Sequence, residues 1–189
     1  MLEYRNPSII CVEFRYTLGG RTGNQAVTAY ELDDVDRQLL NLLQENARYT
    51  AIELAEELGV SDNTVHNRME RLESEGVIIG YTTAVDYDRT GLELYFHFSC
   101  TARISKRGDV AEQAMEIPAV VEVTELMTGQ ENLQIKAVGA EDEDITHVAE
   151  QLDELALEIN DENLIRAEHT ALLDYVEVSE LLDDETDED

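Results

Sequence analysis

Basic residues are scarce in this chain of 189 residues. Lys and Arg number 13 against 43 Asp and Glu, which gives a formal net charge of −30, and the only lysines are Lys106 and Lys136. Because polyanions are bound by cations, this balance by itself argues against a nucleic-acid partner. The acids are nevertheless spread over every segment, a pattern typical of adaptation to molar intracellular salt, where charge repulsion is screened within about 3 Å. The alternative is an acidic protein without a polyanionic partner.

Long apolar runs and metal-binding patterns are also missing. No stretch approaches the ~18 apolar residues of a membrane-spanning helix, and the first residues lack the features of a secretory signal, so we expect a cytoplasmic protein. Cys11 and Cys100 form no CxxC pair, and the histidines show no metal-ligand spacing, which predicts no disulfide framework, structural metal or cofactor. The four histidines are His66, His97, His147 and His169.

The first 26 residues differ in charge from the rest, with two acids against three bases. This segment ends in the sequence GGRTGN, and three interpretations of it remain open. It is a disordered basic arm that contacts DNA, a short added strand, or upstream sequence translated from an over-long reading frame. Val27 favours the third, because a GTG start codon inside such a frame would be translated as valine. We therefore expect residues 1–29 to form an extension outside the folded domains.

Three helices are predicted between residues 30 and 75. An apolar stripe from Leu32 to Leu43 predicts the first helix, with Asp33 or Asp34 as its N-cap. Thr50 begins a second helix that ends at Gly59. Ser61 is a good N-cap for a third helix, which runs to about Glu75. The β-branched stretch 77–85 then predicts a hairpin.

The third predicted helix has two different sides. Val65, Met69 and Leu72 share one side and are expected to face the first two helices. The other side carries groups that can pair with base edges or phosphates. Two short helices joined by a tight turn and followed by a β-ribbon are how a helix-turn-helix places its second helix in the major groove of double-stranded DNA. The predicted DNA-binding residues are Ser61, Asn63, Thr64, His66, Asn67, Arg68 and Arg71.

The alternative interpretation of this helix is a solvated surface, which is favoured for any single residue but less for the whole set. Residues 31–85 hold twelve acids and four bases. Attraction to phosphate is therefore expected to be weak, and binding is expected to depend on base contacts and salt ions.

The second half of the chain changes its period. Alternation of apolar and polar residues over 92–104 predicts a long strand with one buried face. A helix at 109–116, strands at 120–126 and 133–138, a helix with an apolar stripe from Ile145 to Ile159, and a final strand within 165–176 are then predicted. The order β-α-β-β-α-β is the ferredoxin-like arrangement. The expected fold is therefore α+β, with a winged helix-turn-helix at 30–86, a ferredoxin-like domain at 91–178 and an acidic tail at 179–189.

The segment LDDVDRQLLNLLQENARYTAIELAEELGVSDNTVHNRMERLESEGVIIGY resembles the DNA reader of the Lrp/AsnC family of bacterial and archaeal transcription regulators. The resemblance covers about residues 32–178. The matching positions are Asp33, Asp36, Leu39, Leu40, Leu54, Ala55, Gly59, Ser61, Val65, Arg68, Leu72, Gly76 and Ile78.

The resemblance implies a sequence-specific DNA-binding regulator and no enzyme. In the family, ferredoxin-like domains pair through their sheets into homodimers, which often assemble further, and small effectors, commonly amino acids, bind between dimers near a Gly-x-x-Asp turn. Here the corresponding residues are Met127, Thr128, Gly129 and Asn132, and Asn132 stands where the family usually has Asp. The alternative is a plain hairpin with glycine at a positive φ.

Two other functions are compatible with the sequence. Sirohaem decarboxylases share the two-domain build, and His97 on a sheet face could act on a porphyrin, although no cluster of Arg and His accompanies it. A DNA-silent partner that forms mixed oligomers with relatives is the second alternative.

Overall fold

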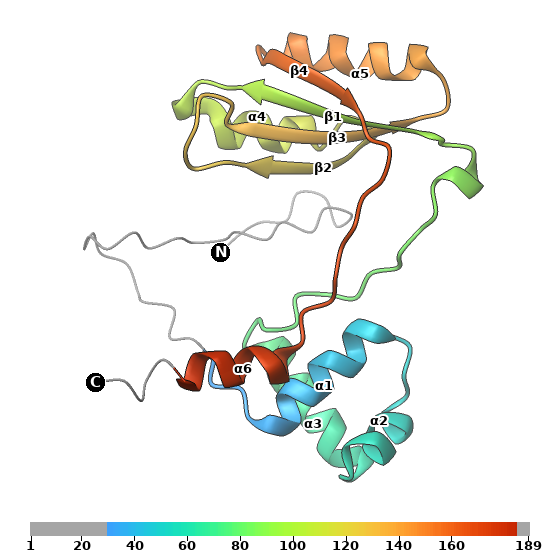
Figure 1. Ribbon diagram of the computed structural model, residues 1–189, viewed down its shortest axis with the longest axis vertical. Coiled ribbons are helices and arrows are strands. Elements are labelled where there is room, and N and C mark those ends of the chain that lie inside the picture. Colours follow the sequence, from blue (N-terminus) through green and yellow to red (C-terminus); the bar gives the residue numbers. More distant parts are fainter. Residues whose placement is uncertain (1–29, 185–189) are drawn as a thin grey trace. The chain divides into compact units, whose positions relative to one another are not determined.

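The computed structural model describes residues 30–184, so the predicted extension at 1–29 lies outside the described residues (Figure 1). The chain divides into two compact units: one extends to Thr83 and also includes the segment from Thr170, and the other is Ala84–His169. The first unit therefore combines residues from both ends of the described chain, a boundary that differs from the expected domain at 91–178. Within the described part of the chain, no helix is long and apolar enough to cross a membrane.

Local capping signals define the three helices of the first unit. Asp33 and Thr50 each form a capping box, in which the side chain accepts a hydrogen bond from the third residue of the helix and that residue's side chain accepts one from the cap. Gly59 ends the second helix in the left-handed region, and the hydroxyl of Ser61 caps the third helix. These starts and stops confirm the prediction. The helices are α1 (Asp34–Glu45), α2 (Ala51–Leu58) and α3 (Asp62–Ser74).

Leucines contributed by all three helices form the core of this unit. Burying each such side chain stabilises the fold by about 1.5–3 kcal/mol. One charged residue, Asp36, is buried among them with 0% of its surface exposed. The buried apolar residues are Leu39, Leu40, Leu43, Leu54, Ala55, Val65 and Leu72.

The hairpin predicted at 77–85 is wrong, because this stretch forms no strand. The N–H groups of Val77 and Ile78 both donate to the carbonyl of Leu72, and the two side chains pack partly against the helical core. Beyond them, Ile79 and Tyr81 are exposed. β-Branched residues favour a strand when they fit a half-buried pleated surface, and an isolated hairpin in water is marginal.

A helix, α6 (Tyr175–Asp184), replaces part of the final strand expected within 165–176 and of the acidic tail expected at 179–189. Figure 1 shows α6 beside α1. The amide of Asn41 donates to the carboxylate of Asp174 at 2.8 Å and accepts from the N–H of Tyr175 at 3.0 Å. Gln44 donates to the carbonyl of Leu173 at 2.9 Å. The C-terminal segment therefore belongs to the helical unit.

The second unit is a four-stranded antiparallel sheet in the order β2-β3-β1-β4. Both of its α-helices pack on the same face, since their buried side chains join one apolar cluster with Phe98, Leu133 and Ile135. This confirms the ferredoxin-like fold. The elements are η1 (Asp88–Thr90), β1 (Leu94–Thr101), η2 (Ile104–Lys106), α4 (Arg107–Ala114), β2 (Val120–Glu125), β3 (Leu133–Gly139), α5 (Asp142–Glu154) and β4 (Glu158–Leu164).

Two boundaries in this unit differ from the prediction. Ile159, expected on the apolar stripe of a helix, lies in β4 and packs against the cluster from the sheet. The chain leaves α5 through Ala156, which has φ 60°, so the last strand begins before the expected 165–176. The long strand predicted at 92–104 is shorter at both ends as β1.

Candidate nucleic-acid interface

The turn between α2 and α3 fixes where α3 begins. Gly59 has φ 67°, a conformation that glycine adopts without steric cost, and only Val60 separates it from the cap. The Ser61 hydroxyl accepts from the N–H of Thr64 at 3.1 Å and lies 2.8 Å from the Thr64 hydroxyl. The hydroxyls of Ser61 and Thr64 therefore lie together at the N-terminus of α3, where Ser61 caps the helix.

Two buried residues fix the rotation of α3 about its axis. Val65 and Leu72 have 0% exposed surface and pack against the leucines of α1 and α2. Met69 is half-buried on the same side. This confirms the predicted inward side of the helix.

The opposite side of α3 is exposed and rich in amides. Asn63, His66 and Asn67 are exposed, and their side chains form no hydrogen bond or ion pair with other described residues. Glu70 is exposed on the same side. An asparagine amide can form a bidentate pair with adenine in the major groove. Three of the predicted DNA-binding residues thus share a free, polar surface.

Arg68 and Arg71 are placed differently from the expectation, in which both belong to the DNA-reading set. Nη1 of Arg68 donates to carboxylate oxygens of Asp33 and Asp36, each at 2.7 Å. Nη2 of Arg71 donates to Asp36 at 2.9 Å, and its guanidinium lies 5.5 Å from the ring centroid of Tyr30. Both arginines are therefore engaged with residues preceding or within α1.

The ion pair between Asp33 and Arg68 favours the charged forms of both groups. Partial burial raises the pKa of Asp33, but the hydrogen bonds from Arg68 and from the N–H of Asp36 outweigh it, so the pKa lies below its ordinary value. The hydrogen bond to Asp33 is the main reason that the pKa of Arg68 is raised. The Asp36 side chain is only 1% exposed. Removing one partner of such a buried pair costs about 3–5 kcal/mol, because a charge is left without compensation.

A pattern in the sequence could have revealed this cluster. Asp36 lies three residues before Leu39 and four before Leu40, so it occupies the buried stripe of α1. A carboxylate at such a position requires a cation from a neighbouring element. Arg68 follows Val65 by three residues and precedes Leu72 by four, which places it beside the inward side of α3.

The predicted effector turn connects β2 to β3. Gly129 has φ 114°, and a Cβ there would lie 3.3 Å from the carbonyl oxygen of Glu131. Met127, Thr128 and Gly129 are exposed. A glycine at positive φ agrees with the plain-hairpin interpretation.

Asn132 is buried, with 6% of its surface exposed, and differs in this from the other three effector candidates. Its Oδ1 accepts from the N–H of Ala102 at 2.9 Å, and its Nδ2 donates to the carbonyl of Ala102 at 2.9 Å. The amide therefore joins the end of the turn to the backbone that follows β1, and both of its polar atoms are engaged there.

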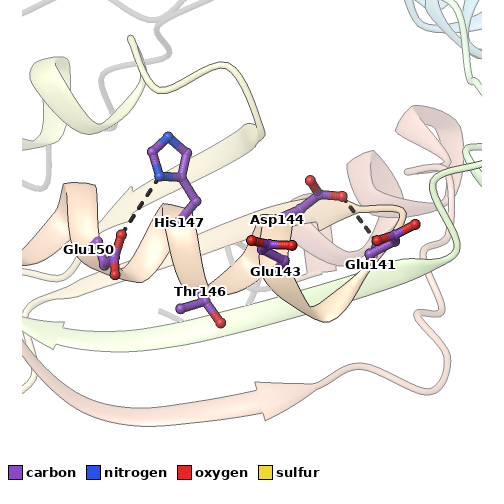
Figure 2. A pocket seen from close by; sticks show the side chains of 6 residues that line it. All are labelled: Glu141, Glu143, Asp144, Thr146, His147 and Glu150. Atoms are coloured by element: carbon purple, nitrogen blue, oxygen red, sulfur yellow. Dashed lines mark hydrogen bonds and ion pairs between the residues drawn. The ribbon is translucent and has the colours of Figure 1, made fainter.

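A shallow hollow of about 350 Å³ lies at the start of α5 (Figure 2). Its polar groups mostly serve the helix start, since the Asp144 carboxylate accepts from the N–H groups of Ala140 and Glu141. Nδ1 of His147 lies 3.8 Å from Glu150. Among the described residues, no group of three His, Cys, Asp or Glu side chains could hold a metal ion.

The sequence matches the family model described as "Winged helix-turn-helix DNA-binding" over residues 32–79. An uncharacterized HTH-type transcriptional regulator of Pyrococcus horikoshii is 35% identical over 121 residues, which cover 62% of this chain and 79% of that protein. The HTH-type transcriptional regulator AldR of Mycobacterium tuberculosis is 32% identical over 126 residues, covering 65% of this chain and 70% of AldR.

Solved structures agree with these relatives. The crystal structure of AldR from M. tuberculosis superposes with a TM-score of 0.61 at 29% identity and covers 75% of this chain and 99% of that one. The feast or famine regulatory protein of M. tuberculosis, complexed with L-methionine, superposes with a TM-score of 0.68 at 25% identity, covering 75% of this chain and 96% of that one. Both structural similarities extend over 75% of this chain, beyond the helix-turn-helix at residues 32–79.

Proposed function

The chain belongs to the Lrp/AsnC family of DNA-binding transcription regulators, and we propose that it reads its operator through the outward side of α3. The observation that carries this proposal is the exposed set Asn63, His66 and Asn67, which stands opposite the buried Val65 and Leu72. Base edges in the major groove present the donors and acceptors that such side chains pair with.

Ser61 and Thr64 have a different role in the proposed interface. Their hydroxyls lie at the start of α3, where N–H groups of the first turn and the helix dipole favour an anion. A phosphate bound there would set the register of the helix on the duplex without reading sequence. Arg68 and Arg71 are left out of the proposed base-reading set because the carboxylates of Asp33 and Asp36 hold them.

The test begins with selection of bound sequences from a random duplex pool in buffers from 0.2 to 2 M KCl. Asn67→Ala is expected to lose about 1–3 kcal/mol for the selected site, as for a lost base contact. Gln113→Ala removes an exposed helical amide from α4 and serves as the matched control, with no expected change. A folded wild-type protein that selects no sequence at any KCl concentration would refute the proposed function and favour a DNA-silent partner.

We further propose that Ala84–His169 is the assembly and sensing unit and that it forms homodimers through the sheet face opposite α4 and α5. Both helices of this unit cover one face. On the other face, His97 of β1 is paired in register with Lys136 of β3 and with Asn163 of β4.

His97→Glu tests this interface. Lys136 beside residue 97 already pairs with Glu122 and Glu168, so circular dichroism first checks that the variant is folded; two copies of the new carboxylate facing each other would repel. The dimer dissociation constant, measured by sedimentation, is expected to rise at least tenfold, for a loss of about 1.4 kcal/mol. His147→Glu, on the exposed side of α5, is the control. Equal dimerisation of both variants would contradict the proposed face.

An amino acid is the proposed class of effector, with Met127, Thr128 and Gly129 as its contacts. The support is the exposed turn in this chain and the L-methionine held by the structurally similar M. tuberculosis protein. A ligand that binds only the folded state stabilises it by about 2.7 kcal/mol at a hundred times its dissociation constant. Thermal unfolding with each amino acid at 10 mM measures this shift. A shift that Thr128→Ala leaves unchanged would place the ligand elsewhere.

A further inference from the structure

The helix that is proposed to read DNA carries two arginines. The guanidinium group of each is held in an ion pair with a carboxylate of the same unit. Arg68 and Arg71 are the basic residues of α3. Arg68 is bound by two carboxylates, and its side chain is 21% exposed. Arg71 is bound by Asp36 and is 46% exposed. The two guanidinium groups and the carboxylates of Asp33 and Asp36 form a cluster without net charge between α3 and the start of α1.

We propose that Asp33 and Asp36 set the salt dependence of DNA binding, because they hold Arg68 and Arg71 against α1 and withhold both from DNA phosphates. This inference rests on the proposed function of α3. Phosphate contacts attract all sequences equally, whereas base contacts discriminate among them. Withholding the cations therefore weakens binding to the operator and to unrelated DNA by a similar factor, and leaves the base contacts of α3 to discriminate between them.

The contacts of Asp36 explain why the arginines stay in place. Oδ1 of Asp36 accepts from both Arg68 and Arg71, and Oδ2 accepts from Arg71. Asp36 is buried, so an arginine that turned toward a phosphate would leave a buried carboxylate short of compensation. The phosphate contact would have to exceed this cost. At a solvated duplex surface and in high salt, an added ion pair is too weak to do so.

The proposal predicts a shallow salt dependence. Each phosphate contact adds about 0.9 to the slope of the logarithm of affinity against the logarithm of salt concentration. Neither arginine contributes to this slope in the wild-type protein. If both were released, a fourfold rise in KCl would weaken binding by an additional factor of about 12.

The first experiment releases the arginines. Asp33→Asn/Asp36→Asn removes both negative charges while asparagine keeps a good N-cap at residue 33. Glu31→Gln/Glu45→Gln is the matched control, since it removes the same charge from exposed residues before and within α1 that form no ion pair with other described residues. Affinity for the operator and for an unrelated duplex is measured from 0.1 to 1.6 M KCl with the full chain. The double variant is expected to steepen the slope by up to about 1.8 on both duplexes and to leave the ratio of operator to unrelated affinity unchanged.

The second experiment is reciprocal and uses Arg71→Gln and Arg68→Gln. Each single variant is expected to keep the wild-type slope, because neither guanidinium contacts phosphate. A slope lower by about 0.9 in either folded variant would overturn the proposal. Arg71→Gln alone decides the matter if the double Asp variant does not fold, since Arg71 is half exposed.

Failure of the proposed function and failure of the arginine proposal give different results. Absence of any selected sequence for the wild-type protein refutes the proposed function. A wild-type protein that reads a sequence, together with a double Asp variant whose slope equals that of the Glu31→Gln/Glu45→Gln control, refutes the sequestration of the arginines alone.

Discussion

Asn132 should contribute to folding rather than to ligand binding, and its replacement tests this directly. Asn132→Ala removes two hydrogen bonds of 2.9 Å and leaves the N–H and carbonyl of Ala102 without partners. Ala102 is 5% exposed, so water cannot replace them fully. Each unsatisfied buried group costs about 1–3 kcal/mol, so the two groups give an expected destabilisation of about 2–6 kcal/mol. This is a large part of the 5–15 kcal/mol typical of folded domains.

Asn132→Asp tests the two hydrogen bonds separately, because only the one to the carbonyl of Ala102 then depends on pH. The carboxyl retains an acceptor for the N–H of Ala102 but faces the carbonyl of Ala102 with an oxygen in place of Nδ2. Only the protonated form can donate there, and burial further disfavours the charged form, so the pKa of the introduced group is raised above about 3.9. The destabilisation is therefore small below about pH 4 and grows as the pH rises through the raised pKa.

Urea unfolding followed by far-UV circular dichroism measures both effects at one protein concentration, since assembly also stabilises the fold. The free energy of unfolding of each variant is compared with that of the wild type between pH 4 and 7. Changes below about 1 kcal/mol at pH 7 in both variants would refute the structural role. Loss of the effector response with unchanged stability would instead identify Asn132 as a ligand contact.

Three further changes test a close contact, a helix glycine and the hydrogen bond that attaches α6. Gly139→Ala places a Cβ 3.0 Å from side-chain carbons of Asp144 and Ile145 and is expected to cost about 1–3 kcal/mol in urea unfolding, whereas a negligible cost would show that this contact relaxes freely. Gly108→Ala has no non-neighbouring atom closer than 4.0 Å and is expected to stabilise α4 by about 0.5 kcal/mol, with a loss of stability arguing against the open space. The hydrogen bond from Asn41 is the main cause that lowers the pKa of Asp174, so the stability it gives is present above about pH 4 and lost as the pH falls through the lowered value. The protection of α6 amides against hydrogen exchange, relative to the intrinsic rate at each pH, should fall below about pH 4, and Asp174→Asn should remove that dependence.

Features set by neighbouring residues are the ones that the sequence predicts well. Thr50, Gly59 and Ser61 act within one helical turn, and the structure confirms all three as caps. The period-two alternation likewise places Phe98 and Cys100 on the buried face of β1. Such signals need no knowledge of distant residues, because the hydrogen bonds that they satisfy belong to the same turn.

Features set by distant residues are the ones that sequence reasoning misses. Val176 and Val178 favour a strand locally, yet the segment becomes α6 because Asn41, more than 130 residues earlier, binds its first turn. Arg68 has the chemistry of a base reader, but a carboxylate 32 residues away determines where its guanidinium lies. In both cases long-range pairing outweighs the local preference.

The scarcity of cations and the proposed mode of DNA reading have a common physical basis. Three of the four arginines between residues 30 and 83 are held in ion pairs with α1 or the residue before it, and no lysine lies in this stretch. In the molar salt that the acidic composition predicts, charges are screened within about 3 Å, so attraction to phosphate would add little even if more cations were present. Hydrogen bonds between Asn63 or Asn67 and base edges act at contact distance and depend far less on screening. A reader built from amides therefore keeps its discrimination in high salt. It should also lose less affinity between 0.2 and 1 M KCl than a lysine-rich relative, and an equal or steeper loss would contradict this reasoning.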